Sequence, residues 1–284
     1  MKDILLVCLI FLLHFVLLSN YTIAQEGWFP INKSAGGNHL KSIYFINDST
    51  GYTVSNEGNL FITNDRGNNW SHIKLSDNSL NDIFFFGSTG FIVGENGTIF
   101  KKEENQSWIE KNSGTNNKLN AVYFIDADTG YAFGDNSTII KTTNGGDNWE
   151  KLIIIQELTI TDGAFPMPEF GLCTSMEGIL ISTQDYGRSW QYLSFPEDNL
   201  FYSIFFPDTA VAYITAWGGD LDYILKLTNR GNEWKVKWPE TLSNINSSFF
   251  HNADTGYIVG SNGLISKTTD GGNTWNHQKS FTRS

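Results

Sequence analysis

Short apolar runs separated by Gly, Asn and Asp recur along the whole chain after residue 38. Each unit has three such runs, as at 40–46, 50–54 and 58–62, and a Trp follows at the start of a fourth run. Alternation over this length favours β-strands, and turn residues at hairpin distance favour antiparallel pairing. The first run is almost continuously apolar, which predicts a strand buried on both faces. No segment shows a sustained helical period, so the pattern predicts an all-β protein.

The unit repeats about every 40 residues. Its Trp stands at Trp28, Trp70, Trp108, Trp149, Trp190, Trp234 and Trp275. Four antiparallel strands at this period are typical of a propeller blade. We name the strands of a unit A to D in chain order. The units fall at about 39–77, 79–114, 118–154, 157–196, 199–240 and 242–280. We therefore expect one six-bladed β-propeller domain over 25–284, with the strand at Trp28 helping to close the ring. A seventh, incomplete blade is the alternative.

Each Trp ends an octapeptide, the box, with Thr, Asp and Gly at fixed positions, as at 268–275. The carboxylate of the box Asp can accept hydrogen bonds from backbone N–H groups of its own turn. A Gly at the same position of each regular box indicates a positive φ at that position. The acidic or amide residue of the box is Asp65, Asn144, Asp185, Asn229 or Asp270, and Glu103 holds this position in the degenerate box at 101–108. A hydrogen-bonded turn tolerates these exchanges better than a metal site, so the boxes are predicted to be structural. Their Trp residues are predicted to pack between neighbouring blades.

The box resembles the Asp-box, or BNR, repeat of sialidases, sortilin-type receptors and xyloglucanases. The whole unit more closely resembles the photosystem II stability/assembly factors, which residues 118–149 and 245–275 follow almost letter for letter. The resemblance implies a β-propeller and a role in protein assembly. The family is associated with an arginine-rich patch. This chain departs from it, because its only arginines are Arg66, Arg188, Arg230 and Arg283.

The net charge of −11 argues against nucleic acid as a partner, because a binding face would need basic residues to replace phosphate counterions. A cationic protein segment or Ca²⁺ suits such a chain better. The N-terminus has the pattern of a signal peptide over 1–24, with Lys2, an apolar run at 4–18 and a cleavage site at Ala24. That run is shorter than the roughly 20 residues of a membrane span. We expect export to the periplasm, cell surface or medium. Cys173 would then be the only cysteine left, so no internal disulfide is expected.

Catalysis is not expected. The arginines lie in the boxes or at the tail, so a sialidase-type triad is missing. A glycoside hydrolase needs two carboxylates across a cleft. The candidates are Asp126, Asp128, Asp162, Asp220 and Asp222. The first two recur at A–B turns, where Asp is an ordinary turn former. The histidines have no metal-ligand spacing, and no phosphate-binding loop appears, so no metal or cofactor is expected.

The predicted binding face carries the B–C turns, opposite the boxes. Acidic residues stand at these turns in five blades: Glu57, Glu95, Asp135, Glu177, Asp220 and Asp222. The repeat breaks at an apparent insertion between strands B and C of blade 5, at 215–223. We therefore predict Trp217, Asp220, Asp222 and Tyr223 as the main binding residues, with Trp217 as an aromatic hot spot. The predicted function is a non-catalytic scaffold that binds a protein or peptide. The alternative is a glycan-binding protein or glycoside hydrolase.

Overall fold

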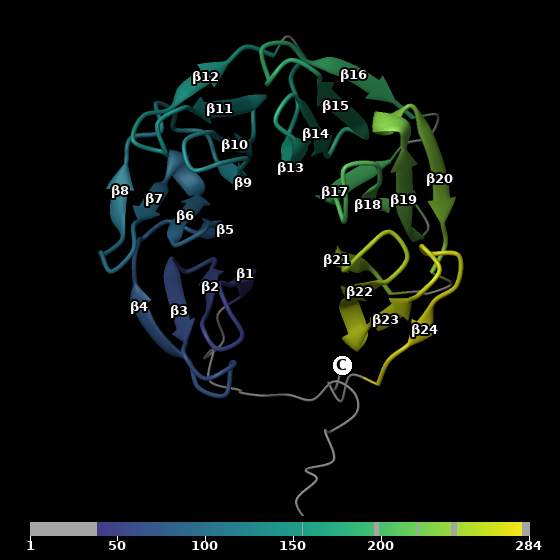
Figure 1. Ribbon diagram of the computed structural model, residues 1–284, viewed down its shortest axis with the longest axis horizontal. Helices are drawn as coiled ribbons and strands as arrows, with labels where there is room; N and C mark the ends of the chain where they lie inside the picture. Colours follow the sequence, from purple (N-terminus) through teal and green to yellow (C-terminus); the bar gives the residue numbers. More distant parts are fainter. Residues whose placement is uncertain (1–38, 155, 196–198, 220, 240–242, 280–284) are drawn as a thin grey trace, which may run out of the picture.

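The computed structural model describes residues 39–154, 156–195, 199–219, 221–239 and 243–279. Within them the chain forms six four-stranded antiparallel sheets arranged around a central axis, and no α-helix (Figure 1). The prediction of an all-β, six-bladed propeller is confirmed. The predicted contribution of the strand at Trp28 lies outside the described residues.

Every blade is made of four consecutive strands, with strand A innermost and strand D outermost (Figure 1). The strands are β1 (Leu40–Phe45), β2 (Gly51–Ser55), β3 (Asn59–Thr63) and β4 (Ser71–Lys74) in blade 1; β5 (Leu80–Phe86), β6 (Thr89–Gly94), β7 (Ile99–Lys102) and β8 (Ile109–Lys111) in blade 2; β9 (Leu119–Phe124), β10 (Gly130–Gly134), β11 (Thr138–Thr142) and β12 (Glu150–Leu152) in blade 3; β13 (Ile160–Met167), β14 (Phe170–Ser175), β15 (Ile179–Thr183) and β16 (Gln191–Ser194) in blade 4; β17 (Leu200–Phe205), β18 (Ala212–Trp217), β19 (Asp222–Thr228) and β20 (Glu233–Lys237) in blade 5; and β21 (Ile245–Phe250), β22 (Gly256–Gly260), β23 (Ile265–Thr268) and β24 (Asn276–His277) in blade 6.

Two details correct the sequence predictions. Strand B, not strand A, is the fully buried strand, as β2 and β10 show. Strands β5 and β9 mix buried with more exposed positions, and β1 has no buried residue. The inner strand meets the central channel, so only part of it can be covered. The stretch 215–223 is also not an inserted loop. Trp217 ends β18 and pairs with Asp222, the first residue of β19, so the hairpin is simply longer.

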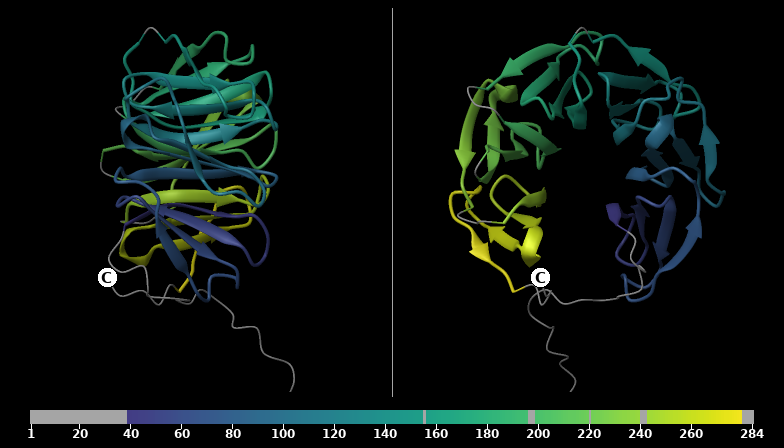
Figure 2. Two further views of the ribbon diagram at one scale, coloured as in Figure 1. Left: turned by 90° about the vertical axis from the view of Figure 1, so that its left-hand side faces the viewer. Right: turned by 180° about the vertical axis from the view of Figure 1, so that it is seen from behind.

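Hydrogen bonds define the two faces of the ring. On the bottom face the boxes of blades 1, 3, 4 and 6 are bonded to their A–B turns, for example from the Gly145 N–H to the Asp128 carbonyl at 2.8 Å. On the top face the B–C turn is bonded to the residue before strand A in blades 1 to 4 and 6, for example from the Asp135 N–H to the Lys118 carbonyl at 3.0 Å. The side view in Figure 2 shows the strands running between these faces. The boxes and the B–C turns therefore lie on opposite faces, as predicted.

Stacked aromatic rings fill the seams between blades. The ring of Phe124 in strand A lies 3.7 Å from that of Phe91 in the preceding blade, and Trp149 packs edge-on against it at 5.9 Å. The ring also covers Gly130, where an added Cβ would come within 2.6 Å of it. The same arrangement recurs where Phe165 stacks on Tyr131 at 4.2 Å. Repetition of Phe in strand A and Gly in strand B thus builds the core blade by blade.

Two carboxylates join strand A of one blade to strand A of the next. Asp82 accepts hydrogen bonds from the Val122 N–H at 2.9 Å and from Ser42 Oγ at 2.7 Å. Asp162 accepts one from the Ile204 N–H at 3.0 Å. Burial raises the pKa of Asp82 to about 6, and burial together with the charge of Asp82 raises the pKa of Asp162 to about 7. Both groups therefore bind protons more tightly in the folded protein than in the unfolded chain.

Stability should consequently fall as the pH rises through these pKa values. The unfolded carboxyls ionise near pH 4, so the folded state holds extra protons between about pH 4 and 7, and each carboxyl should cost about 3–4 kcal/mol at neutral pH. In urea unfolding at about pH 4.5 and 7.5, Asp82→Asn/Asp162→Asn should lose less stability with rising pH than the unsubstituted protein. The exposed Asp77→Asn variant is the control. An unchanged pH slope in the double variant would contradict the expectation.

Candidate functional site

The boxes are closed by hydrogen bonds within their own turns. Asp270 accepts bonds from Thr268 Oγ1 and the Thr274 N–H, both at 2.9 Å, and from Thr274 Oγ1 at 2.6 Å. These bonds, first of all that from Thr274 Oγ1, lower the pKa of Asp270 to about 2. The Gly two residues after the box Asp or Asn has a positive φ in every regular box, at Gly67, Gly146, Gly187, Gly231 and Gly272. The carboxylate oxygens are thus used by the turn itself.

The boxes that lack Asp keep only part of this arrangement. Asn144 still accepts the Asn148 N–H at 3.0 Å, whereas Asn229 begins a 3-10 turn and its amide bonds to Glu233. The box Trp residues vary in burial: Trp149 is buried, Trp234 is exposed, and Trp70, Trp108, Trp190 and Trp275 lie between these extremes. Trp108 contacts Tyr52 of the preceding blade with ring centroids 6.5 Å apart. This contact crosses the seam between blades.

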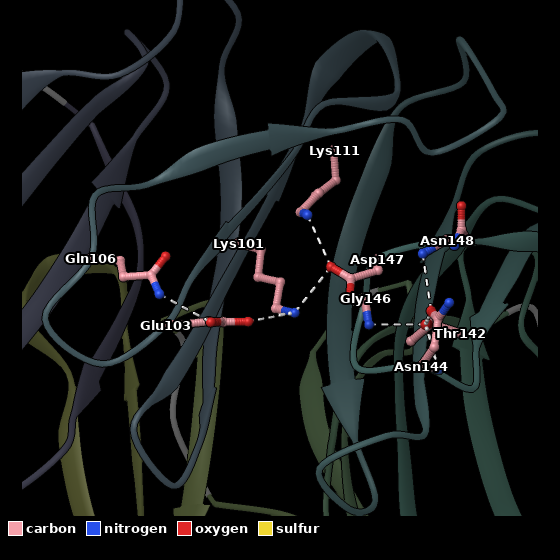
Figure 3. A network of polar contacts seen from close by, with 9 residues as sticks. All are labelled: Lys101, Glu103, Gln106, Lys111, Thr142, Asn144, Gly146, Asp147 and Asn148. Carbon is pink, nitrogen blue, oxygen red and sulfur yellow. Dashed lines mark hydrogen bonds and ion pairs between the residues drawn. The ribbon is translucent and has the colours of Figure 1, made fainter.

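In the degenerate box of blade 2, ion pairs take the place of the hydrogen bonds within the turn (Figure 3). Glu103 accepts from Gln106 Nε2 at 3.2 Å and pairs with Lys101 Nζ at 3.1 Å. Lys101 and Lys111 both reach Asp147 in the box of blade 3, at 3.1 and 2.9 Å. Bonds from Lys111 and then Lys101 lower the pKa of Asp147. This network joins two boxes at the bottom rim and leaves no carboxylate in it without a cation or donor.

Of the predicted acidic residues, Glu57, Glu95, Asp135 and Glu177 lie at the B–C turns of blades 1 to 4, and several of them are engaged locally. Glu95 pairs with Lys118 at 3.6 Å, Asp135 accepts from Asn120 Nδ2 at 2.9 Å, and Glu177 accepts the Thr159 N–H at 3.0 Å. Glu57 is exposed. Asp220 lies outside the described residues. These residues mark the top rim but do not converge on one point.

A pocket of about 460 Å³ lies at the top of the junction between blades 5 and 6. Its lining residues are Leu200, Tyr202, Trp217, Asp222, Asn244, Ile245 and Asn246. Residues 200, 217 and 222 are direct neighbours across three strands, because Leu200 pairs with Trp217 and Trp217 with Asp222. The pocket therefore combines two aromatic rings, two carboxamides and one carboxylate.

The structure brings together two of the four main predicted binding residues. Trp217 and Asp222 line the pocket, and the buried carboxylate of Asp222 accepts the Ile245 N–H across the blade seam. Tyr223 points to the other side of the sheet, because neighbouring residues of a strand face opposite ways. There its hydroxyl donates to Asn199 and its ring packs against Trp238 at 5.2 Å. Tyr223 thus lies behind the pocket and not in it.

Sequence reasoning missed Tyr202, Asn244 and Asn246. Residue 202 occupies a strand-A position that is Asn81, Asn120 or Thr161 in blades 2 to 4. In those blades the side chain bonds to a backbone carbonyl of the next blade, at 2.7–2.8 Å. Tyr in place of the short polar residue was a visible break in the repeat. It changes the seam at the point where the pocket opens.

Among the described residues, the pocket contains a single carboxylate, that of Asp222. Of the other acidic candidates, Asp126 accepts the backbone N–H groups of Asp128 and Thr129 in its own turn, and Asp162 joins two blades. Within the described parts of the chain, no group of three His, Cys, Asp or Glu side chains is arranged to hold a metal ion. Cys173 is buried in β14. No helix in the described segments is both long and apolar enough to span a bilayer.

The fold places the protein in the class of β-propellers, and comparisons with known proteins show which propellers it resembles. The family model of the photosynthesis system II assembly factor YCF48 matches residues 100–198, which is less than half of the chain. Residues 100–198 are thus similar to the family of this assembly factor, and the described residues have the fold of a β-propeller. A search of curated proteins found no match.

Solved structures share the fold at low sequence identity. "YCF48 from Cyanidioschyzon merolae" superposes with a TM-score of 0.72 at 16% identity, over 88% of each chain. "YCF48 bound to D1 peptide" gives 0.69 at 18% identity, over 84% of this chain and 81% of that one. A GH74 enzyme of Niastella koreensis gives 0.70 at 13% identity, over 85% of this chain but only 45% of the enzyme. At these identities the structural matches establish the fold alone.

Proposed function

We propose that this chain is a non-catalytic, protein-binding β-propeller that holds an extended segment of a partner protein in the pocket between blades 5 and 6. The observation that carries the proposal is the composition of that pocket. Trp217 and Tyr202 offer rings for apolar side chains, and Asn244 and Asn246 offer donors and acceptors for a peptide backbone. A solved propeller with a similar fold is described as bound to a peptide, which supports this use of the architecture.

A basic segment is the partner that the charges favour. The chain carries a net charge of −11, and the exposed Glu57 and Glu177 stand on the same face as the pocket. Complementary charge accelerates encounter and depends on salt. Binding of a lysine-containing peptide should therefore weaken as ionic strength rises, mainly through a slower association rate.

Glycan binding is the second candidate, favoured by the aromatic pair in the pocket and by the fold shared with the GH74 enzyme. Hydrolysis is a weaker expectation, because retaining and inverting glycosidases both use two carboxyl groups across the scissile bond. Of the carboxyl groups in the described residues, the pocket presents only that of Asp222, which already accepts a backbone N–H.

The test is binding to a peptide selected from a displayed random library, measured with the full exported chain. Trp217→Ala should raise the Kd about 30-fold, as truncation of an aromatic hot spot costs about 2 kcal/mol. The matched control is Trp238→Ala, another top-side Trp that packs on Tyr223 outside this pocket. Equal losses in both variants, or binding of a glycan array in place of peptides, would overturn the proposal.

Export is part of the proposal and rests on the signal-peptide pattern at 1–24. The chain would then act outside the cytoplasm. Mass spectrometry of the protein expressed with its own N-terminus should find a mature chain that begins at Gln25. Recovery of the chain with residues 1–24 attached would contradict this.

A further inference from the structure

The ring of blades is interrupted between blade 6 and blade 1. Figures 1 and 2 show β1 and the strands β21 and β22 on either side of an opening. Side-chain exposure, and not the ribbon alone, shows that both walls of this opening are uncovered. We call the opening the 6/1 seam, with walls formed by Leu40, Ile43 and Phe45 of blade 1 and by Phe249 and Val259 of blade 6.

The wall on blade 1 is apolar and exposed where its counterparts are buried. Leu40, Ile43 and Phe45 are 48%, 57% and 44% exposed. The residues in the same register of blade 2 are Leu80, Ile83 and Phe85, which are 0–3% exposed. Those three pack against Tyr52 and Val54 of the preceding blade, whereas blade 1 has no such neighbour in the described residues.

The wall on blade 6 shows the same contrast. Phe249 and Val259 are 56% and 38% exposed. The residues in the register of Val259 include Val54, Val93 and Phe133, which are fully buried against the next blade. The counterparts of Phe249 in other blades, Tyr44, Phe84 and Phe205, are half-buried. Five large apolar side chains thus face one opening, and each is more exposed than its counterparts in the other blades. A large exposed apolar patch of this kind marks an interaction surface.

The chain supplies a segment suited to this place. We propose that residues 25–38 insert into the 6/1 seam and cover its two apolar walls with Trp28, Phe29 and Ile31. This segment directly precedes β1, whose own residues form one wall. The eight residues 32–39 can span up to about 26 Å when extended, which exceeds the length of β1. The segment is therefore tethered within reach of both ends of the seam.

Composition and tethering favour this occupant over a second copy of the chain. Three of the fourteen residues are large and apolar, they are clustered at 28–31, and the only charges are Glu26 and Lys33. A tethered segment binds at an effective concentration near the millimolar range for a short linker, which a separate molecule does not reach at ordinary protein concentrations. The inference does not depend on the proposed peptide pocket, which lies at the junction of blades 5 and 6.

The test is the accessibility of a cysteine in the seam. In the full exported chain, Ile43→Cys should react with a soluble maleimide about tenfold more slowly than in Trp28→Ser/Phe29→Ser/Ile43→Cys, if the segment is bound about nine-tenths of the time. Ile109→Cys, on the outer strand β8 and 53% exposed, is the control and should react equally in both backgrounds. The buried Cys173 should stay unreactive throughout, which verifies that each variant is folded.

A cross-link identifies the occupant. Phe29→Cys/Ile43→Cys treated with a short bismaleimide should give a monomeric product with residues 29 and 43 joined. A covalent dimer, or protection of residue 43 that disappears on dilution, would show that a second copy fills the seam and would overturn the proposal. Equal reactivity of residue 43 in both backgrounds would overturn it as well.

Discussion

Phe124→Ala is expected to reduce the free energy of unfolding by about 3–5 kcal/mol, as other buried Phe truncations do. The ring is buried, stacks on Phe91 at 3.7 Å, supports Trp149 and covers Gly130. Its removal opens a cavity in the seam between blades 2 and 3 that rigid strands cannot close. For a domain of this size the melting temperature should fall by roughly 10 °C.

Calorimetry and urea unfolding of the same variant would measure this loss. Ile153→Ala is the control, because Ile153 is 91% exposed and its truncation should change stability by less than about 0.5 kcal/mol. A loss below about 1 kcal/mol for Phe124→Ala would mean that the aromatic stacks are not the main support of the seams.

Gly146→Ala is expected to destabilise the protein by about 2–5 kcal/mol. Gly146 has a φ of 82°, and an added Cβ would lie 2.6 Å from Cε1 of the buried Phe91. The substitution therefore combines a left-handed backbone with a collision inside the core. Thermal unfolding should show the effect without any change in the top-face pocket.

The neighbouring glycine provides a matched control. Gly145 has a φ of 65°, and other boxes carry Arg66, Tyr186 and Arg230 at the same position with φ of 64°, 63° and 55°. Gly145→Arg should cost less than about 1 kcal/mol, because this position accepts side chains elsewhere in the chain. Similar losses at both glycines would contradict the assignment of the second one as the core-facing position.

The fold could be predicted because its determinants are local and repeated. The recurring Trp, the Gly of strand B and the box each specify a blade by short-range contacts, as Thr268 and Asp270 do within one turn. The burial of strand B could not be predicted in this way. It depends on the neighbouring blades and on the channel, which leave strand A partly exposed although most of its residues are apolar.

The site was located only in part. Trp217 and Asp222 were found because they interrupt the repeat, but Tyr223 was included by adjacency, and strand alternation places it behind the sheet. Tyr202 was missed because it sits inside a regular strand, where its size matters only against the next blade. Contacts between blades join residues about 40 positions apart in the sequence. The local sequence pattern within one blade therefore does not show which side chains meet across a seam.

The most direct test of peptide binding at the top face is a crystal structure of the chain with a peptide selected by binding. The account predicts the peptide between Trp217 and Tyr202, with Asn244 or Asn246 bonded to its backbone. A peptide bound among the boxes on the bottom face, or a pocket between blades 5 and 6 that stays empty beside a bound peptide, would contradict it.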